Sequence, residues 1–559
     1  MRFDPILPPA RVAAMKAQGH WRDRLLTDLF DARVAQEPDK LGVIDGNSMT
    51  GKSSRLTFRE LAHRVDRLAA GLAALGVAKG DVVAWQLPNW WQFTALHLAC
   101  LRIGAISGSL MPIFRERELS FMLGLAEAKV LVVPRSFRGF DHAAMARALR
   151  PSLPHLRHVL VIGGEGTDGF EALLNARAPE RTDILRLFAD RQPAPDDVIE
   201  VQYTSGTTGE PKGVMHTSNT LLAQVDGFVE RLRLSSDDVV LMASPMAHQT
   251  GFLYGLIMPA MLGATAVLQD IWDPRRAAAA MAAERVTFTM GATPFLSDIT
   301  ELVSGGGHDV SSLRVFVSAG APIPRALVER AGPALGAHIV SAWGMTENGA
   351  VTMTGPEDPP DKTVNTDGAC LPGMEIKVFD TDGKALPSEV EGQLKVRGAH
   401  NFVGYLKRPQ LYGHDEEGWF DTGDLARIDA DGYVRITGRA KDLLIRGGEN
   451  IPVVEIEGLL FRHPDVQEVA IVGMPDPRLG ERACAFVVPR PGAKLSLSEL
   501  TQFLGQHKVA RQYLPERLEL VADLPRTPSG KVQKFKLREM AKGFTPARAP
   551  LSSRAKRGI

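Results

Sequence analysis

Thr204-Ser-Gly-Thr-Thr-Gly-Glu-Pro-Lys-Gly213 is the most informative stretch of this 559-residue chain. It follows an apolar run, Val198 to Tyr203, that predicts a strand. The backbone N–H groups of such a loop can turn toward an anion, its hydroxyls can reach phosphate oxygens or Mg²⁺, and Lys212 adds a positive charge. The order differs from the P-loop of nucleoside triphosphatases, because Pro211 stands where that motif needs its second glycine. The stretch predicts a polyphosphate-binding loop; any four of its residues alone would indicate only a surface hairpin.

The bulk composition predicts a multidomain globular protein. A chain of 559 residues is too long for one hydrophobic core, so at least two domains are expected. Lys plus Arg (65) equals Asp plus Glu (65), so no global field favours nucleic acid or an anionic membrane. The cysteines Cys100, Cys370 and Cys484 are widely spaced, form no metal-ligand pattern and suit a reducing compartment.

The targeting signals in the sequence are weak. Met1 to Ala10 lacks the charged start and apolar core of a signal peptide. The apolar segment Trp90 to Phe114 contains His97 and Arg102, and Asn89 is a plausible N-cap for a helix starting at Trp90, which favours a buried helix. We therefore expect a cytoplasmic protein without a membrane span, either a monomer or a homodimer.

Alternating patterns predict an α/β fold from about residue 55 to 410. Arg59 to Leu75 has apolar residues at helical spacing and stops at Gly76. Short apolar runs with β-branched residues predict buried strands. These runs are 129–133, 158–162, 239–242, 286–290, 315–317 and 338–340.

Two further units follow. Asp382-Gly383 lies between two β-rich runs, 376–379 and 392–396, and predicts a hairpin in a small β subdomain. Beyond Arg439, a helix near Pro452, strands at 468–472, 483–488 and 517–521, and a capping box at Ser496-x-x-Glu499 predict a compact α+β domain. We predict layered α/β sheets with the β subdomain over 1–440, a smaller mobile α+β domain over 441–540, and a disordered basic tail over 541–559.

Several other motifs have both a functional and an ordinary interpretation. Trp343-Gly-Met-Thr-Glu347 brings an aromatic ring, a hydroxyl and a carboxylate to a strand end, although a core tryptophan is the commoner reading of such a turn. Ser318-Ala-Gly-Ala-Pro322 ends another strand with small residues that permit close approach of a flat ligand. Asp424 is a suitable acceptor for vicinal hydroxyls with Arg439 beside it, and the plain alternative is an ion pair across a hairpin.

Two single residues also have ordinary alternatives. Lys531 lies in the turn Pro525-Arg-Thr-Pro-Ser-Gly-Lys531, where a lysine usually has no catalytic role. His248 lies near a strand end, where a hydrogen-bonded structural histidine is common. Gly164-Glu-Gly-Thr-Asp-Gly169 fits the dinucleotide fingerprint, but no clean strand delivers the ribose-binding acid, and a solvent loop is the better interpretation.

These motifs occur together, in this order, in a pattern that resembles the adenylate-forming superfamily of acyl-CoA synthetases, peptide-synthetase adenylation domains and firefly luciferase. The resemblance covers about residues 20 to 540. It implies an ATP-dependent, AMP- and pyrophosphate-forming carboxylic acid–CoA ligase that uses ATP, Mg²⁺ and coenzyme A and acts on a small-molecule acid.

The resemblance also implies roles for individual residues. Lys531 would bridge the acid's carboxylate and the α-phosphate, Lys441 would be the domain hinge, and His248 would lie against the acyl pocket. Thr207 and Glu347 would position Mg²⁺, and Gly447 and Gly448 would shape the pantetheine tunnel. The residues implied to contact ATP are Thr204, Ser205, Gly206, Thr207, Thr208, Gly209 and Lys212 at the phosphates, Gly320, Ala321, Pro322 and Trp343 at the adenine, and Asp424 and Arg439 at the ribose. Gly344, Met345 and Thr346, which follow Trp343, are also implied to bind the cofactor. The family usually has tyrosine where Trp343 stands, which bears on the width of the pocket.

The acid itself is less defined by the sequence. Candidate lining residues are small or apolar and carry no charge, which favours an uncharged acyl group. They are Phe252, Leu253, Ala292, Gly320, Trp343 and Met345. The segments 110–119 and 134–140 resemble the branch of cyclohexanecarboxylate-CoA ligases and short- to medium-chain acyl-CoA synthetases, which implies an alicyclic or medium-chain acid. The alternatives are an enzyme that loads a carrier protein, an NAD-linked oxidoreductase using Gly164 to Gly169, and a non-catalytic nucleotide-binding relative.

Overall fold

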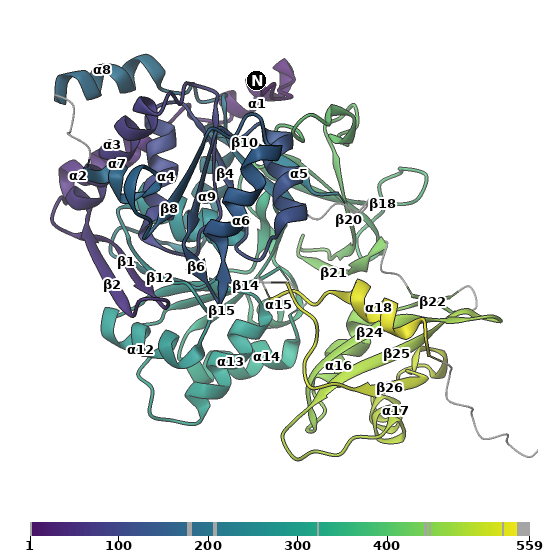
Figure 1. Ribbon diagram of the computed structural model, residues 1–559. Coiled ribbons are helices and arrows are strands. Elements are labelled where there is room, and N and C mark those ends of the chain that lie inside the picture. Colours follow the sequence, from purple (N-terminus) through teal and green to yellow (C-terminus); the bar gives the residue numbers. More distant parts are fainter. Residues whose placement is uncertain are drawn as a thin grey trace, which may run out of the picture.

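The computed structural model describes residues 3–175, 181–204, 210–320, 323–440, 444–446, 449–527 and 530–544. Two large sheets dominate the first three quarters of the chain (Figure 1). The first has the order β10 (Lys212–Thr217), β9 (Val198–Thr204), β4 (Ile106–Ser109), β3 (Val82–Trp85), β5 (Val130–Pro134) and β8 (His158–Ile162). The second has the order β17 (Ala369–Cys370), β16 (Gly349–Met353), β15 (His338–Met345), β14 (Val315–Ala319), β13 (Phe288–Gly291), β11 (Val239–Met242), β12 (Thr265–Gln269), β1 (Leu41–Asn47) and β2 (Lys52–Thr57).

Helices cover both faces of each sheet, which produces five layers. The layer between the two sheets is formed by α2 (Leu26–Gln36), α3 (Phe58–Ala74), α4 (Trp91–Arg102), α9 (Ser218–Leu232) and the continuous helical segment α10 (Gln249–Phe252), η3 (Leu253–Ile257) and α11 (Met258–Leu262). The outer face of the first sheet packs on α5 (Glu116–Ala126) and α6 (His142–Leu149), and that of the second on α12 (Pro274–Glu284), α13 (Thr293–Ser304) and α14 (Arg325–Leu335). Because both faces are covered, parallel strands such as β3, β5 and β13 are buried along their whole length.

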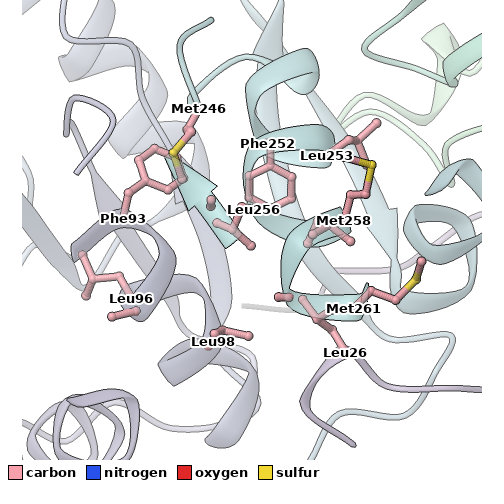
Figure 2. Close-up of a cluster of buried hydrophobic side chains, with 14 of the residues drawn as sticks. Leu26, Phe93, Leu96, Leu98, Met246, Phe252, Leu253, Leu256, Met258 and Met261 are labelled. Atoms are coloured by element: carbon pink, nitrogen blue, oxygen red, sulfur yellow. The ribbon is translucent and has the colours of Figure 1, made fainter. Parts of the chain in front are cut away.

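The layer between the sheets holds the largest core cluster. Figure 2 shows side chains of α4 and of the 249–262 helical segment meeting there. Phe252 and Leu253 are fully buried in this cluster, and the ring of Phe252 lies 4.8 Å from that of His97. The structure therefore corrects the expectation that Phe252 and Leu253 are exposed to an open pocket, since their side chains already pack against neighbouring helices.

A small antiparallel sheet follows the second large sheet. Its order is β18 (Met374–Phe379), β19 (Gly392–Gly398), β20 (Phe420–Ile428) and β21 (Val434–Arg439), and the predicted hairpin turn contains Gly383 at φ +80°. Strand β15 is longer than predicted. It continues through Trp343 to Met345, so the first three residues of the Trp343 string belong to the strand, and Thr346 and Glu347 lie in the turn after it.

The remaining elements are a short hairpin, peripheral helices and the C-terminal unit. The peripheral elements are β6 (Ser136–Phe137), β7 (Phe140–Asp141), α1 (Pro9–Ala17), α7 (Glu171–Asn175), α8 (Arg181–Arg191) and α15 (Pro360–Asn365). The C-terminal unit contains β22 (Leu444–Arg446), β23 (Glu449–Ile451), β24 (Val466–Asp476), β25 (Gly480–Pro489), β26 (Arg517–Leu520), α16 (Val453–Leu460), α17 (Leu497–Gln506) and α18 (Lys534–Ala541).

The C-terminal unit has its own core. Helices α16 and α17 pack on one face of its sheet and α18 on the other. The predicted capping box is present, with Ser496 accepting from the Glu499 N–H. Ala541 is fully buried and Phe544 packs on the same core, so the folded chain extends past the predicted start of the tail. Residues 545–559 lie outside the described residues.

Asn89 joins the two large sheets and is not the predicted helix cap. Helix α4 begins at Trp91, and its first N–H donates to Asp45 at 2.8 Å. The buried Asn89 amide instead donates to carbonyls at the ends of β11 and β12, among them Ser244 at 2.8 Å, and accepts from the Met246 N–H at 2.8 Å. One side chain thereby satisfies loop backbone groups that would otherwise be buried without partners.

We predict that Asn89→Ala lowers the free energy of unfolding by about 2–4 kcal/mol, because it leaves several buried backbone groups unpaired. Urea denaturation of purified protein measures this. The exposed Asn365→Ala is the control and should change stability by less than about 0.5 kcal/mol. Equal effects of the two substitutions would contradict the bridging role.

Candidate active site

The predicted site residues lie at the carboxyl ends of parallel strands, where open α/β sheets bind ligands. Thr204 ends β9, His248 follows β11, Ala292 follows β13, and Gly320 follows β14. Gly320 has φ +82° and nothing within 4 Å of the position of a Cβ, so its backbone borders open space. Several predicted residues lie outside the described ones, namely Ser205, Gly206, Thr207, Thr208, Gly209, Ala321, Pro322, Lys441, Gly447 and Gly448.

The two ends of the phosphate loop meet across a hairpin. Thr204 of β9 pairs directly with Lys212 of β10. The Lys212 ammonium lies 4.8 Å from the centre of the Tyr405 ring, a cation–π distance. Glu210 forms a 2.5 Å ion pair with Arg408. Lys212 is therefore held in place at the end of the loop, where the chain enters β10.

Glu347 lies beside this lysine as a buried carboxylate. Its Oε1 accepts a 2.7 Å hydrogen bond from the Tyr405 hydroxyl. Burial raises the pKa of Glu347, while the hydrogen bond and the charges of Lys212 and Arg439 oppose that rise. No sequence motif indicates Tyr405, which is 58 residues from Glu347 in the chain.

Asp424 and Arg439 form the predicted ion pair between β20 and β21. The Arg439 Nε lies 2.8 Å from Asp424 Oδ1, and the two residues are direct cross-strand partners. Trp343 contributes a donor that the sequence did not indicate, since its Nε1 donates to Asp424 Oδ2 at 2.9 Å. The ion-pair and ligand-binding interpretations of Asp424 are compatible, because a carboxylate offers about four acceptor sites.

Gly344 explains how Trp343 reaches the small sheet. The pairing of β15 with β16 shifts register between Trp343 and Gly344, as at a β-bulge, which redirects a side chain. A Cβ at Gly344 would collide with the carbonyl of Gly349, so the bulge requires glycine. Met345 packs with Trp343 against the neighbouring core cluster.

The hairpin that carries Lys531 lies against the large unit. A Cβ on Gly530 would lie 3.1 Å from the Cβ of Ala292. Burial, together with the nearby charge of Lys531, lowers the pKa of His248 to about 4. The C-terminal unit therefore places Lys531 beside the loops after β11 and β13.

Arg526 fastens that hairpin to the C-terminal sheet. It donates to the Gly530 carbonyl at 2.8 Å and pairs with Glu468 at 2.6 Å. Within the turn, the Thr527 N–H donates to the Lys531 carbonyl at 2.8 Å. Two ion pairs also link the units, Arg490 with Glu301 at 3.4 Å and Arg462 with Glu329 at 3.8 Å. Such exposed pairs contribute little stability individually.

The Gly164 to Gly169 segment is a closed turn. Val161 forms a bridge with Gly169, and a Cβ on Gly164 would lie 2.8 Å from the Val161 carbonyl. Gly164 and Gly169 are explained by close contacts within the loop's own backbone, and Gly166 by its φ of +65°.

His216 supports the segment Trp343 to Glu347 through a hydrogen bond to its backbone. It is fully buried on β10, and its Nε2 donates to the Thr346 carbonyl at 2.8 Å. Burial lowers the pKa of His216 to about 4. The neutral imidazole thus holds the backbone next to Glu347.

The comparisons with known proteins agree with this arrangement. The model of the AMP-binding enzyme family matches residues 30–406, and that of its C-terminal domain matches residues 455–531. The chain is 38% identical to the medium-chain fatty-acid–CoA ligase of Escherichia coli (strain K12), over 95% of this chain and 92% of that protein. It is 32% identical to the 2,3-dihydroxybenzoate-AMP ligase of Bacillus subtilis (strain 168), over 95% and 96% of the two chains.

Solved structures are similar in fold. The ATP-bound MatB of Rhodopseudomonas palustris matches with a TM-score of 0.81 and 29% identity, covering 92% of this chain and 99% of that one. The anthranilate CoA ligase AuaEII, in complex with anthranoyl-AMP, matches with a TM-score of 0.81 and 26% identity, covering 93% and 98%.

The chain belongs to the AMP-binding enzyme family, the adenylate-forming superfamily that the motifs resemble. It is an ATP-dependent, acid-adenylating ligase of the acyl-CoA synthetase type, with ATP, coenzyme A and a small-molecule acid as substrates. Among the helices in the described ranges, none has the length and apolarity to span a bilayer.

We predict that His216 makes stability depend on pH between about 6.5 and 4. In that window the unfolded state binds a proton that the native state excludes, so stability falls as pH falls. His216→Gln should reduce the slope of the unfolding free energy by about 1.4 kcal/mol per pH unit, measured by urea denaturation. The exposed His155→Gln should leave the slope unchanged; a wild-type slope in His216→Gln would show that the imidazole is protonated in the native state.

Proposed function

We propose that this protein is an acyl-CoA synthetase that activates an uncharged, alicyclic or short- to medium-chain carboxylic acid as its acyl-adenylate and transfers the acyl group to coenzyme A. The observation that carries the proposal is the position of Lys531 beside His248 and Ala292, at the strand ends where Thr204 and Gly320 also lie. An ammonium from the C-terminal unit thereby faces the site formed by the large unit.

The chemistry of the first half-reaction requires that ammonium. A carboxylate oxygen attacks the α-phosphorus of ATP, the bond to the β-phosphate oxygen breaks, and pyrophosphate leaves. An anion that approaches a triphosphate is repelled, so the barrier is largely electrostatic. Lys531 would neutralise charge between the carboxylate and the α-phosphate, and Lys212 would do so at the departing phosphates.

The carboxylate of Glu347 fits a magnesium site. Mg²⁺ takes oxygen ligands, usually one or two carboxylates together with phosphates, and Glu347 supplies a buried carboxylate close to Lys212. Glu347 and Thr207 would hold the ion, which would supply charge neutralisation on the triphosphate. Tyr405 orients the Glu347 carboxylate through its 2.7 Å hydrogen bond.

The second half-reaction needs a different arrangement. The coenzyme A sulfur attacks the acyl carbon, the bond to the AMP oxygen breaks, and AMP leaves. We propose that residues 441 to about 544 rotate as a mobile domain about Lys441, which withdraws Lys531 and brings Gly447 and Gly448 to the site. Among the described residues, the links that would have to break include the Arg490–Glu301 and Arg462–Glu329 ion pairs and the contact of Gly530 with Ala292. Exposed ion pairs cost little to break, which suits a domain that moves.

We predict that Lys531→Ala abolishes acid-dependent ATP–pyrophosphate exchange, at least 100-fold, while thioester formation from supplied acyl-adenylate falls by less than about threefold. Lys441→Pro, in the same pair of assays, should show the opposite imbalance, because proline restricts the hinge backbone. Lys536→Ala, a substitution on the C-terminal helix α18, is the control and should change neither rate. Equal loss of both half-reactions in Lys531→Ala would refute this division of labour.

The proposed substrate class is inferred from the candidate lining residues of the acyl pocket and from the names of similar proteins. Ala292 and Met345 are apolar and sit near Gly530 and Trp343, without a fixed charge to bind a second carboxylate. One relative is named for medium-chain fatty acids, and others are named for salicylate and 2,3-dihydroxybenzoate. The names of the latter two relatives favour an aryl acid, which is therefore the second candidate substrate.

A panel of acids separates these candidates. We predict that kcat/KM for octanoate or cyclohexanecarboxylate exceeds that for benzoate, salicylate and palmitate by at least tenfold, measured as pyrophosphate release. Preference for salicylate would establish the aryl-acid alternative, and preference for palmitate would exclude both. Coenzyme A-dependence of AMP release distinguishes a CoA ligase from an enzyme that loads a carrier protein.

A further inference from the structure

The Asp424 carboxylate is fixed from two directions. It is 4% exposed, and each of its oxygens already has a protein donor. Arg439 Nε lies 2.8 Å from Oδ1, and Trp343 Nε1 lies 2.9 Å from Oδ2. About two of the four acceptor sites of the carboxylate therefore remain for a ligand.

The second donor determines the plane of the carboxylate. The terminal torsion of aspartate is broad, so one contact fixes one oxygen and leaves the other free to turn. A donor on each oxygen removes that freedom. The remaining acceptor sites then point in fixed directions, as recognition of two neighbouring hydroxyls requires.

The indole is itself held in place. Trp343 lies at the β-bulge between β15 and β16, and its ring packs against the cluster of Val378, Leu394, Ala426 and Val434 in the small sheet. The residue is only partly buried, so part of it remains exposed. One side chain of the large sheet thus connects directly to the carboxylate of the small sheet.

We propose that Trp343 is a positioning residue for ribose recognition: its indole N–H sets the plane in which Asp424 accepts the two ribose hydroxyls of ATP. The inference rests on the proposed function, because it assumes that Asp424 is the ribose acceptor. It assigns Trp343 a role distinct from stacking on the adenine, since stacking uses the face of the ring and this role uses its edge.

Trp343→Phe tests the role, because phenylalanine keeps an aromatic face and lacks the N–H. The measured quantity is the ratio of kcat/KM for ATP to that for 2′-deoxy-ATP and 3′-deoxy-ATP in pyrophosphate release. We expect this ratio to fall about five- to tenfold, through a higher KM for ATP with little change in kcat or in the values for the deoxynucleotides. Calorimetric binding of AMP and 2′-deoxy-AMP should show the same loss without turnover.

Two further variants define the role. In Asp424→Asn, adding Trp343→Phe should cause no further loss of ribose discrimination, because the indole acts through the carboxylate. Trp419→Phe removes another indole N–H, next to β20 of the small sheet, that donates to Glu417 at 3.3 Å, and should leave the ratio unchanged. If Trp343→Phe does not fold, Trp343→Met, which also lacks a donor, is judged by the same ratio.

The outcomes separate the two proposals. An unchanged ratio, or equal losses for ATP and the deoxynucleotides, would overturn the positioning role and leave Trp343 as a stacking or packing residue. Absence of pyrophosphate release by the wild-type protein with every acid would instead contradict the proposed function, and binding of AMP would still report on the ribose contact.

Discussion

The arrangement of this protein depends on bringing one ammonium group, Lys531, to a site that another part of the chain builds. The hairpin around Lys531 is short, and Arg526 holds it to the C-terminal sheet through the Gly530 carbonyl and Glu468. Its contact with the large unit is a close fit of Gly530 against Ala292, together with a few exposed ion pairs. A lysine that must approach the site and then withdraw can do so on a small domain with its own core. A lysine on a strand of the main sheets could not move in this way.

The large unit is built in the opposite way, for rigidity. Five layers put the carboxyl ends of parallel strands at a common edge, and buried polar side chains fix the loops there. Asn89 ties loop carbonyls from two strands of the second sheet to the first sheet, and His216 holds the Thr346 carbonyl. Burying these polar groups without hydrogen-bond partners would raise the free energy of the folded state. Each hydrogen bond therefore also favours one arrangement of the site.

The two carboxylates at the site, those of Glu347 and Asp424, are both held by neighbouring side chains. Glu347 is held by Tyr405, and Asp424 by Trp343 and Arg439, with the partners coming from different elements in each case. Fixing a carboxylate before a ligand arrives reduces the reorganisation that binding would otherwise require. The small sheet contributes Asp424 and Arg439 to the site, and β15 reaches the Asp424 carboxylate with Trp343.

Local patterns determined much of this fold before any contact was known. Strands at 158–162 and 239–242, the hairpin around Gly383 and the capping box at Ser496 depend on neighbouring residues, and the structure has them where the sequence predicts them. The ordered motifs likewise identified the family, because each loop chemistry is encoded in a few consecutive residues. The roles of Asn89, Tyr405 and Trp343 could not be found in this way. Asn89 has the composition of a helix cap but bonds to carbonyls more than 150 residues away, and Tyr405 and Trp343 meet their carboxylates only after three sheets have packed together. The sequence alone determined many of the segments that form strands and helices; the tertiary structure decided which side chains hold the site's carboxylates, because a hydrogen bond between distant residues depends on packing that no local pattern records.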